Sequence, residues 1–224
     1  MSDEAIWKAV DHYVVDSLLP DDPILESALK ANKTAGLPAI DVSPAQGALL
    51  HLLVRMCGAR RVLEIGTLGG YSTIWMARAL PPDGRLVTLE HDEKHAEVAR
   101  SNLHRAGLDG VVEVRTGRAL DLLPGLASEA PFDFVFIDAD KPSNRDYIDW
   151  ALRLARPGTV IVVDNVIRDG EVIQTHSSNA SVQGSRAAFE RLGSEQRLTA
   201  TAVQTVGSKG YDGFAIAIVG EAAG

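Results

Sequence analysis

The feature that most constrains the fold is a pair of short apolar runs that each end in polar side chains. Residues 132–138 read Phe-Asp-Phe-Val-Phe-Ile-Asp, and residues 159–165 read Thr-Val-Ile-Val-Val-Asp-Asn. Runs this short and apolar are typical of strands buried on both faces of a parallel sheet. The carboxyl ends of neighbouring strands in an open sheet border one crevice, so Asp138, Asp164 and Asn165 are expected to face the same space.

These three side chains also form a coherent chemical set. Two carboxylates and one amide are hard oxygen ligands, which suit a cation such as Mg²⁺. An isolated aspartate at the end of a strand has a simpler interpretation as a turn residue or a helix N-cap. Asp138 is interpreted as a metal ligand because a second carboxylate and an amide end the other run. Lys141 lies three residues beyond Asp138; taken alone, it would be a solvated surface lysine.

The rest of the chain places these strands in an alternating series. Apolar strands are predicted near 61–65, 85–89, 111–115, 132–138 and 159–164, and amphipathic helices near 70–80, 92–106, 118–127 and 143–156. Such alternation builds a parallel sheet with helices on both faces, an α/β fold. Helical apolar spacing at 3–18, 22–34 and 44–57 predicts three helices before the sheet, and Ser43-Pro44 supplies the start of the third.

The C-terminal part departs from this alternation. After a helix predicted near 181–193, residues 198–206 and 214–219 predict a hairpin joined by the glycine-rich segment 207–213. The hairpin would finish the sheet with antiparallel strands. Residues 166–180 form a long polar connection beside the predicted metal ligands, where long loops often cover an active site.

Composition excludes several classes of protein. The formal net charge of -8 over 224 residues argues against nucleic acid as a partner. No apolar run approaches the roughly 18 residues of a membrane span, and no signal peptide is apparent, so a cytoplasmic protein is predicted. Cys57, the single cysteine, is expected to be buried rather than catalytic. Without a linker-like stretch, one domain is predicted over 1–224, with a helical segment at 1–58 and the core at 59–224.

A second candidate site follows the first strand. Residues 62–72 read Val-Leu-Glu-Ile-Gly-Thr-Leu-Gly-Gly-Tyr-Ser, in which glycines allow a tight turn and a close approach of the backbone to a ligand. The spacing departs from the dinucleotide fingerprint, and Glu64 disfavours a phosphate but tolerates a cationic or zwitterionic ligand. Glu90, at the end of the second strand, can accept hydrogen bonds from ribose hydroxyls. S-adenosylmethionine meets both demands, whereas a tight turn without a ligand is the alternative for the glycine loop alone.

With these motifs the chain resembles the S-adenosylmethionine- and divalent-metal-dependent O-methyltransferases, the family of the catechol and caffeoyl-CoA O-methyltransferases, and its bacterial members in particular. The likeness covers almost the whole chain, through the segments 40–47, 63–72, 88–90, 117–119, 136–141, 163–165 and 211–213. Its most specific part is Asp-Ala-Asp-Lys at 138–141 together with Asp164-Asn165. The resemblance implies a Rossmann-like class I fold with a seven-stranded sheet. It also implies methylation of a hydroxyl on a small catechol-like or vicinal-dihydroxy aromatic acceptor.

The resemblance assigns roles to single residues. Asp138, Asp164 and Asn165 are implied to bind Mg²⁺ or another divalent cation such as Mn²⁺ or Ca²⁺, and Lys141 is implied to be the catalytic base. The residues implied to bind S-adenosylmethionine are Val42, Glu64, Gly66, Ser72, Glu90, His91, Ala119 and Asp138, with Glu90 at the ribose and His91 beside the adenine. By analogy with family members, a homodimer is expected, with the N-terminal helices and the hairpin as its shared face.

Two departures from the family pattern bear on the acceptor and the adenine. Plant caffeoyl-CoA enzymes carry an aromatic residue shortly after the lysine, whereas this chain has Pro142-Ser143-Asn144, so a CoA thioester acceptor is not implied. Arg118 stands where many relatives have an acidic residue, so the adenine amine is expected to bond to backbone or water. Asp140 has two interpretations, as a neighbour that influences Lys141 or as a solvated carboxylate at a helix start.

Two other functions stay open at this point. A nicotinamide-dependent oxidoreductase would need a phosphate-binding turn and would have no use for the three predicted metal ligands. A non-catalytic nucleotide-binding module would leave Lys141 without a role. Surface or packing roles are predicted for His12, His51, His95 and His104, core packing is predicted for Trp75 and Trp150, and His176 is expected in a loop over the site.

Overall fold

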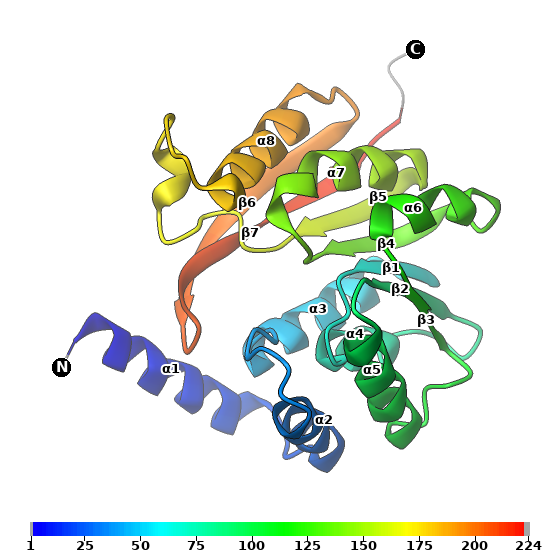
Figure 1. Cartoon of the computed structure of the whole chain (residues 1–224), viewed down its shortest axis with the longest axis vertical. Helices are drawn as coiled ribbons and strands as arrows, with labels where there is room; N and C mark the ends of the chain where they lie inside the picture. The colour runs from blue at the N-terminus through cyan, green and yellow to red at the C-terminus, as the bar shows by residue number, and fades with distance from the viewer. Residues whose placement is uncertain (1, 222–224) are drawn as a thin grey trace.

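The computed structural model describes residues 2–221 and contains, within them, a seven-stranded sheet of order β3-β2-β1-β4-β5-β7-β6 (Figure 1). Residue 1 and residues 222–224, the ends of the predicted domain, lie outside the described residues. The strands are β1 (Arg61–Ile65), β2 (Arg85–Glu90), β3 (Val112–Thr116), β4 (Phe132–Ile137), β5 (Ala155–Val163), β6 (Leu198–Gly207) and β7 (Gly210–Val219). Strands β1 to β5 pair in parallel, and β7 is antiparallel to β5 and β6. The predicted fold class is confirmed.

Helices cover both faces of the sheet, as Figure 1 shows. They are α1 (Asp3–Leu18), α2 (Pro23–Thr34), α3 (Pro44–Met56), α4 (Tyr71–Ala77), α5 (Glu93–Arg105), α6 (Ala119–Leu122), α7 (Asn144–Arg153) and α8 (Ala180–Ser194), with the 3₁₀ turns η1 (Leu123–Ser128), η2 (Lys141–Ser143) and η3 (Glu171–Ile173). Along β4, Phe134 and Phe136 pack with α2 to α5, while Val135 and Ile137 pack with α7 and α8. This burial on both faces explains the uninterrupted apolar run in the sequence.

Side-chain hydrogen bonds set the starts of helices α2 and α3. Asp22 Oδ1 accepts hydrogen bonds from the backbone N–H groups of Ile24 and Leu25, both at 3.1 Å, and proline is the first residue of α2. Ser43 Oγ accepts from Gln46 N at 3.2 Å, again just before a proline. The predicted start of α3 at Ser43-Pro44 is therefore confirmed. Because α3 starts here, the chain immediately before it, including Val42, is held at one end of the sheet.

Two predicted elements were wrong in extent near proline. The helix expected over 118–127 ends at Leu122 and continues as the 3₁₀ turn η1, since Pro124 has no N–H to donate. The helix expected to reach residue 156 ends at Arg153, and β5 begins at Ala155. The sheet register shifts here, from Phe132 opposite Ala155 to Phe134 opposite Val160. An Arg-Pro-Gly segment occupies the shift, and its turn-like composition concealed the early start of the strand.

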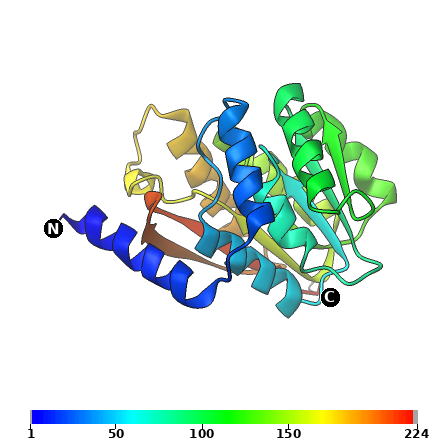
Figure 2. The same ribbon diagram turned by 90° about the horizontal axis from the view of Figure 1, so that it is seen from below.

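The C-terminal hairpin is tighter than predicted. The glycine-rich segment 207–213 belongs mostly to the strands, because β6 reaches Gly207 and β7 begins at Gly210. Helix α1 runs along the outer side of the molecule next to this hairpin, as Figure 2 shows, and Asp11 Oδ2 accepts a 2.7 Å hydrogen bond from Ser208 N. Among residues 2–221, no helix is both long enough and apolar enough to cross a membrane.

Candidate active site

A cavity of about 700 Å³ lies at the carboxyl ends of β1 to β5. The predicted site residues that line it are Val42, Gly66, Ser72, Glu90, His91, Ala119, Asp138, Lys141 and Asn165. Glu64 and Asp164 lie behind its wall, with 0% and 4% of their surface exposed. Residues that are far apart in the sequence thus lie around one cavity, because the carboxyl ends of parallel strands lie at the same edge of the sheet.

Gly66 brings the glycine loop against the segment that carries the predicted metal ligand. Its φ is +99°, and a Cβ added to it would stand 2.0 Å from the carbonyl oxygen of Asp138. Any other residue would therefore suffer both backbone strain and a backbone clash. The two halves of the cavity meet at this contact, so a ligand bound along the glycine loop ends next to Asp138.

Glu90 supports the glycine loop as well as lining the cavity. Its Oε2 accepts hydrogen bonds from the backbone N–H groups of Thr67 at 3.2 Å and Leu68 at 2.8 Å. Its Oε1 accepts from Asp92 N at 2.9 Å. Leu68 has a φ of +50°, so this carboxylate helps to hold a strained turn. Glu90 keeps acceptor capacity toward the cavity, because an ionised carboxylate has about four lone-pair positions.

Glu64 ties three elements together behind the cavity. Ser72 Oγ donates to its Oε1 at 2.6 Å, and Thr88 Oγ1 and Thr73 Oγ1 donate to its Oε2, the first at 2.7 Å. Burial raises the pKa of Glu64 to about 7, against the opposing effect of these hydroxyl donors. Glu64 therefore acts on the cavity through Ser72, whose position it fixes, rather than by lining the cavity itself.

A buried amide network, which the sequence did not reveal, holds the loop that carries Val42. Asn32 Nδ2 donates to Asp41 Oδ1 at 2.8 Å, and Asn102 Nδ2 donates to Asn32 Oδ1 at 2.9 Å and to the carbonyl oxygen of Gly69 at 2.7 Å. Burial raises the pKa of Asp41, which lines the cavity. The network connects α2 and α5 to both cavity loops. A lone asparagine on a helix gives no sequence signal for such a contact.

The end of the cavity beside β4 and β5, the acceptor end, contains two nearby carboxylates. Lys141 is buried, and its Nζ donates to Asp138 Oδ1 at 2.8 Å. Asp164 accepts from Gln46 Nε2 at 2.7 Å and from the backbone N–H of Asn165 at 2.8 Å. Burial and then the negative charge of Asp138 raise the pKa of Asp164 above its usual range. The charge of Asp138 therefore opposes the ionisation of Asp164.

The donors at this end fit a hard divalent cation. No group of three Asp, Glu, His or Cys side chains suited to a metal occurs in residues 2–221, so a cation here would need the Asn165 amide as its third protein ligand. Two carboxylates and an amide oxygen are the ligand types that Mg²⁺ and Ca²⁺ accept. A dication would also compensate the repulsion between Asp138 and Asp164, which the protein alone compensates with Lys141.

Other predicted residues take various positions. Arg118 and Ala119 both line the cavity. The side chains of Tyr147 and Ser143 hydrogen-bond to Asp140, which lies at the start of η2, so its interpretation as a helix-start carboxylate agrees with the geometry. His95, predicted to have a surface or packing role, also lines the cavity, with Nδ1 3.7 Å from Glu90 Oε1.

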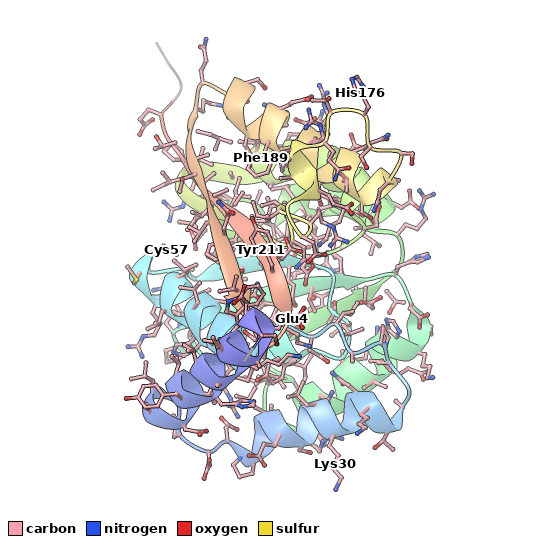
Figure 3. All side chains as sticks on the ribbon, turned by 90° about the vertical axis from the view of Figure 1, so that its left-hand side faces the viewer. Glu4, Lys30, Cys57, His176, Phe189 and Tyr211 are labelled. Carbon is pink, nitrogen blue, oxygen red and sulfur yellow. The ribbon has the colours of Figure 1, made fainter. Side chains whose placement is uncertain are left out.

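His176 lies in the connection that was expected to cover the site. This residue is exposed and does not line the cavity. Figure 3 shows it at the edge of the molecule. The connection it belongs to reaches the cavity through Asn165 and Arg168 instead. The sequence suggested a polar connection, but Val166 and Ile167 at its start are buried in the core.

Comparison with known proteins gives consistent matches over nearly the whole chain. A family model described as O-methyltransferase matches residues 16–210. A catechol O-methyltransferase of Niastella koreensis is 55% identical over 96% of this chain and 98% of its own length. A catechol O-methyltransferase of Mycobacterium tuberculosis is 57% identical, with 94% of each chain covered.

Solved structures agree with these matches. An O-methyltransferase of Bacillus cereus in complex with SAH has a TM-score of 0.95 and 59% identity, over 96% of this chain and 99% of its own. An O-methyltransferase of Streptomyces achromogenes involved in tomaymycin synthesis, in complex with SAM, has a TM-score of 0.95 and 51% identity, over 99% of this chain and 100% of its own. All four of these relatives are named as O-methyltransferases.

Proposed function

This chain belongs to the O-methyltransferase family, and we propose that it transfers the methyl group of S-adenosylmethionine to one hydroxyl of a vicinal aromatic diol, using a divalent cation and Lys141. The chain is an enzyme of the S-adenosylmethionine-dependent class. The observation that carries the finer proposal is the pair Asp138 and Asp164 at one end of the cavity, with buried Lys141 bonded to the first of them. The names of the catechol O-methyltransferase relatives support the acceptor class.

The cofactor would occupy the part of the cavity along the glycine loop. A cavity of about 700 Å³ is within the roughly 300–1,000 Å³ range of small-molecule sites and leaves room for an acceptor. Glu90 is proposed to accept hydrogen bonds from the ribose hydroxyls, with His91 and Ala119 near the adenine. Val42, Gly66 and Ser72 would surround the methionine part. The contact between Gly66 and Asp138 then directs the reactive sulfonium toward the acceptor end.

Asp138, Asp164 and Asn165 are proposed to hold the cation. When bound to these oxygens, Mg²⁺ would supply positive charge that acidifies a nearby hydroxyl and competes with the Lys141 ammonium for Asp138. Gln46 orients Asp164 by donating to its Oδ2, which leaves the direction of the carboxylate fixed before any ligand arrives.

Lys141 is proposed to act as the neutral amine, a form that the positive charge of a bound dication would favour, and to take the proton of the reacting hydroxyl on Nζ. The oxygen then forms a bond to the methyl carbon while the bond from that carbon to the sulfonium sulfur breaks, which gives the methyl ether and S-adenosylhomocysteine. Lys141 is buried, which limits the access of water to its Nζ. Holding both reactants in line contributes up to about 7–11 kcal/mol to the lowering of the barrier.

A chelation experiment tests this proposal. The enzyme is freed of metal with a chelator, dialysed, and assayed for methylation of a catechol with labelled S-adenosylmethionine before and after Mg²⁺ is added. We expect activity to disappear and return, while calorimetry shows cofactor binding at both stages. Full activity in a rigorously metal-free preparation would overturn the role of the cation, and the absence of methylation of any vicinal diol would overturn the acceptor class.

The partner of this chain is proposed to be a second copy of itself. Helix α1 has no buried residue, and Val10 and Tyr13 on it are 55% and 73% exposed. Val203 and Val206 on the neighbouring edge strand β6 are also exposed. An apolar surface made by a helix and an edge strand is typical of a symmetric dimer. Light scattering at micromolar concentration should give the mass of a dimer, and Tyr13→Glu should shift it toward the monomer; a wild-type monomer would contradict the proposal.

A further inference from the structure

Arg168 lines the acceptor end of the cavity, three residues beyond the proposed metal ligand Asn165. Its backbone is in the left-handed region, with a φ of +55°, and so are Asn165 at +52° and Asp169 at +54°. Residues with a Cβ adopt this conformation at a cost, and several such residues together usually mark a functional segment. The segment therefore stores strain directly beside the place where the acceptor is proposed to bind.

Neighbouring elements hold this strained backbone. Asp212 Oδ1 on β7 accepts hydrogen bonds from Ile167 N at 3.0 Å and Arg168 N at 2.9 Å. Ser185 Oγ on α8 donates to the carbonyl oxygen of Asn165 at 3.2 Å. Arg186, also on α8, donates to the carbonyl oxygen of Val172 at 2.7 Å. These contacts fix the backbone of Arg168, and with it the direction from which its side chain enters the cavity.

The Arg168 guanidinium has no hydrogen-bond acceptor among the described residues. Its Nε is buried and unpaired, and its nearest carboxylate oxygen, Asp212 Oδ2, is 3.6 Å from Nη1. Asp212 already accepts two backbone hydrogen bonds from this segment. A guanidinium that lines a cavity without a hydrogen-bonded partner is unusual, because each buried donor left unpaired costs free energy. An oxyanion that entered the cavity would supply the missing acceptor.

The charges at this end of the cavity permit an anion. Asp138, Asp140 and Asp164 supply three carboxylates, and Lys141 and Arg168 supply two cations. A dication bound at the proposed metal site would compensate the two carboxylates that hold it, and Arg168 would remain as a cation that an anion can pair with. The planar fork of a guanidinium matches the two oxygens of a carboxylate better than it matches a single hydroxyl or amide oxygen.

We infer that Arg168 binds a carboxylate substituent of the acceptor, so that the preferred substrates are vicinal aromatic diols that carry an acid group. This inference rests on the proposed function, since it places the diol at Asp138, Asp164 and Asn165. The diol end of the substrate is then held near Lys141, and the acid end is held by the residue three positions beyond Asn165. Arg168 is in this view a specificity residue that contacts the substrate away from the reacting oxygen.

The test compares acids with their amides. Dihydroxyphenyl acids with no, one or two methylene groups between the ring and the carboxyl group are each paired with the primary amide, and kcat/KM is measured for every compound. Longer spacers insulate the ring from the carboxyl group, so each pair with a spacer has diols of nearly equal acidity. Arg168→Gln removes the charge at an unchanged backbone conformation, Arg168→Lys keeps the charge without the fork, and Arg145→Gln removes an exposed arginine of α7 outside the cavity.

We expect the wild-type enzyme to prefer the acid over the amide by about tenfold or more at the best spacer length. Arg168→Gln should bring this ratio close to one, Arg168→Lys should give an intermediate ratio, and Arg145→Gln should keep the wild-type ratio. If the amides are methylated, an unchanged ratio in Arg168→Gln, or a wild-type ratio near one at every spacer length, would overturn the assignment of Arg168 alone. Failure to methylate any of the diols would overturn the proposed function, and this assignment with it.

Discussion

The two halves of the cavity solve the problem of buried negative charge differently. In the cofactor half, made by Glu64, Glu90 and the glycine loop 66–70, each carboxylate accepts three hydrogen bonds from protein donors. In the acceptor half, made by Asp138, Lys141, Asp164, Asn165 and Arg168, two carboxylates lie near each other, and one lysine donates a hydrogen bond to the first of them. The cofactor half is electrostatically complete by itself, whereas the acceptor half is completed by a cation.

This difference separates what each half contributes. A site whose donors are all supplied by the protein keeps its shape without ligand, so it can bind the cofactor first. A site with uncompensated carboxylates gains stability when a cation arrives, and it orders the acceptor only then. Damage to one half should therefore leave the other half working, and the predictions below use that independence.

The largest effect is expected in the acceptor half, at Lys141. Replacing it with Met, which has a similar length and no charge, should lower kcat by ~10²–10⁴-fold, the usual loss for a missing general base. The dissociation constant of S-adenosylmethionine should stay within about twofold, because Lys141 is not bonded to the cofactor half. Single-turnover kinetics and calorimetry measure the two quantities separately. A large change in cofactor affinity would show that the halves are not independent.

The cation should stabilise the acceptor half measurably. At Mg²⁺ concentrations about 100 times its dissociation constant, unfolding of the wild-type protein should become harder by about 2.7 kcal/mol. Asp164→Asn should lose this Mg²⁺ response, while the metal-free variant is no less stable than the metal-free wild type, because the repulsion with Asp138 is gone. Denaturant unfolding with and without Mg²⁺ gives both numbers. A variant that still gains the full stabilisation from Mg²⁺ would move the metal site elsewhere.

The two halves also differ in how far the sequence predicts them. The succession of strands along the chain and the residues that end β1, β2, β4 and β5 follow from hydrophobic runs, because a buried parallel strand must be apolar and its end must not. The positions of Gly66 and Glu90 were predictable for the same reason. The early start of β5 at Ala155 was not, since a shift of sheet register through Arg-Pro-Gly has the composition of a turn.

What the sequence could not provide were contacts between distant side chains. Asn32 and Asn102 lie 70 residues apart, and neither stands in a motif, yet together they hold the loop of Asp41. The hydrogen bond from Gln46 to Asp164 is a similar case. The strained segment around Arg168 is invisible for another reason: its positive φ values occur at residues with a Cβ and are imposed by Asp212 on a distant strand. Tertiary hydrogen bonds, rather than local propensity, decide these parts of the site.

In the cofactor half, Glu90→Gln should weaken S-adenosylmethionine binding by about 2 kcal/mol, roughly thirtyfold. The amide loses charge-assisted bonds to the ribose and can accept fewer of the backbone N–H groups that Glu90 now holds. The Mg²⁺ stabilisation should be unchanged. Calorimetry with Glu97→Gln, an exposed glutamate on α5, is the matched control. Wild-type cofactor affinity in Glu90→Gln would remove this residue from the site.

The cofactor half should also give rise to a pH dependence of folding that comes from Glu64. Burial raises its pKa from 4.5 to about 7 in the folded protein, so between these values the folded state keeps a proton that the unfolded state has lost. Stability then decreases as the pH rises through this window and levels off above it. Since one pKa unit corresponds to about 1.4 kcal/mol, this contribution should be at most about 3 kcal/mol.

Glu64→Gln should remove that slope, because the amide can bond to the same three hydroxyls, which rotate to donate or accept, and it carries no charge at any pH. Glu97→Gln, at an exposed position of α5, should leave the slope in place. Chemical denaturation of both variants from pH 4.5 to 8, without cofactor or metal, gives the comparison. If Glu64→Gln kept the wild-type slope, the pH dependence would belong to another group, and the Glu64 carboxyl would be ionised in the folded protein across this range. The cofactor half would then contain an uncompensated buried charge of its own, and the contrast between the two halves would fail.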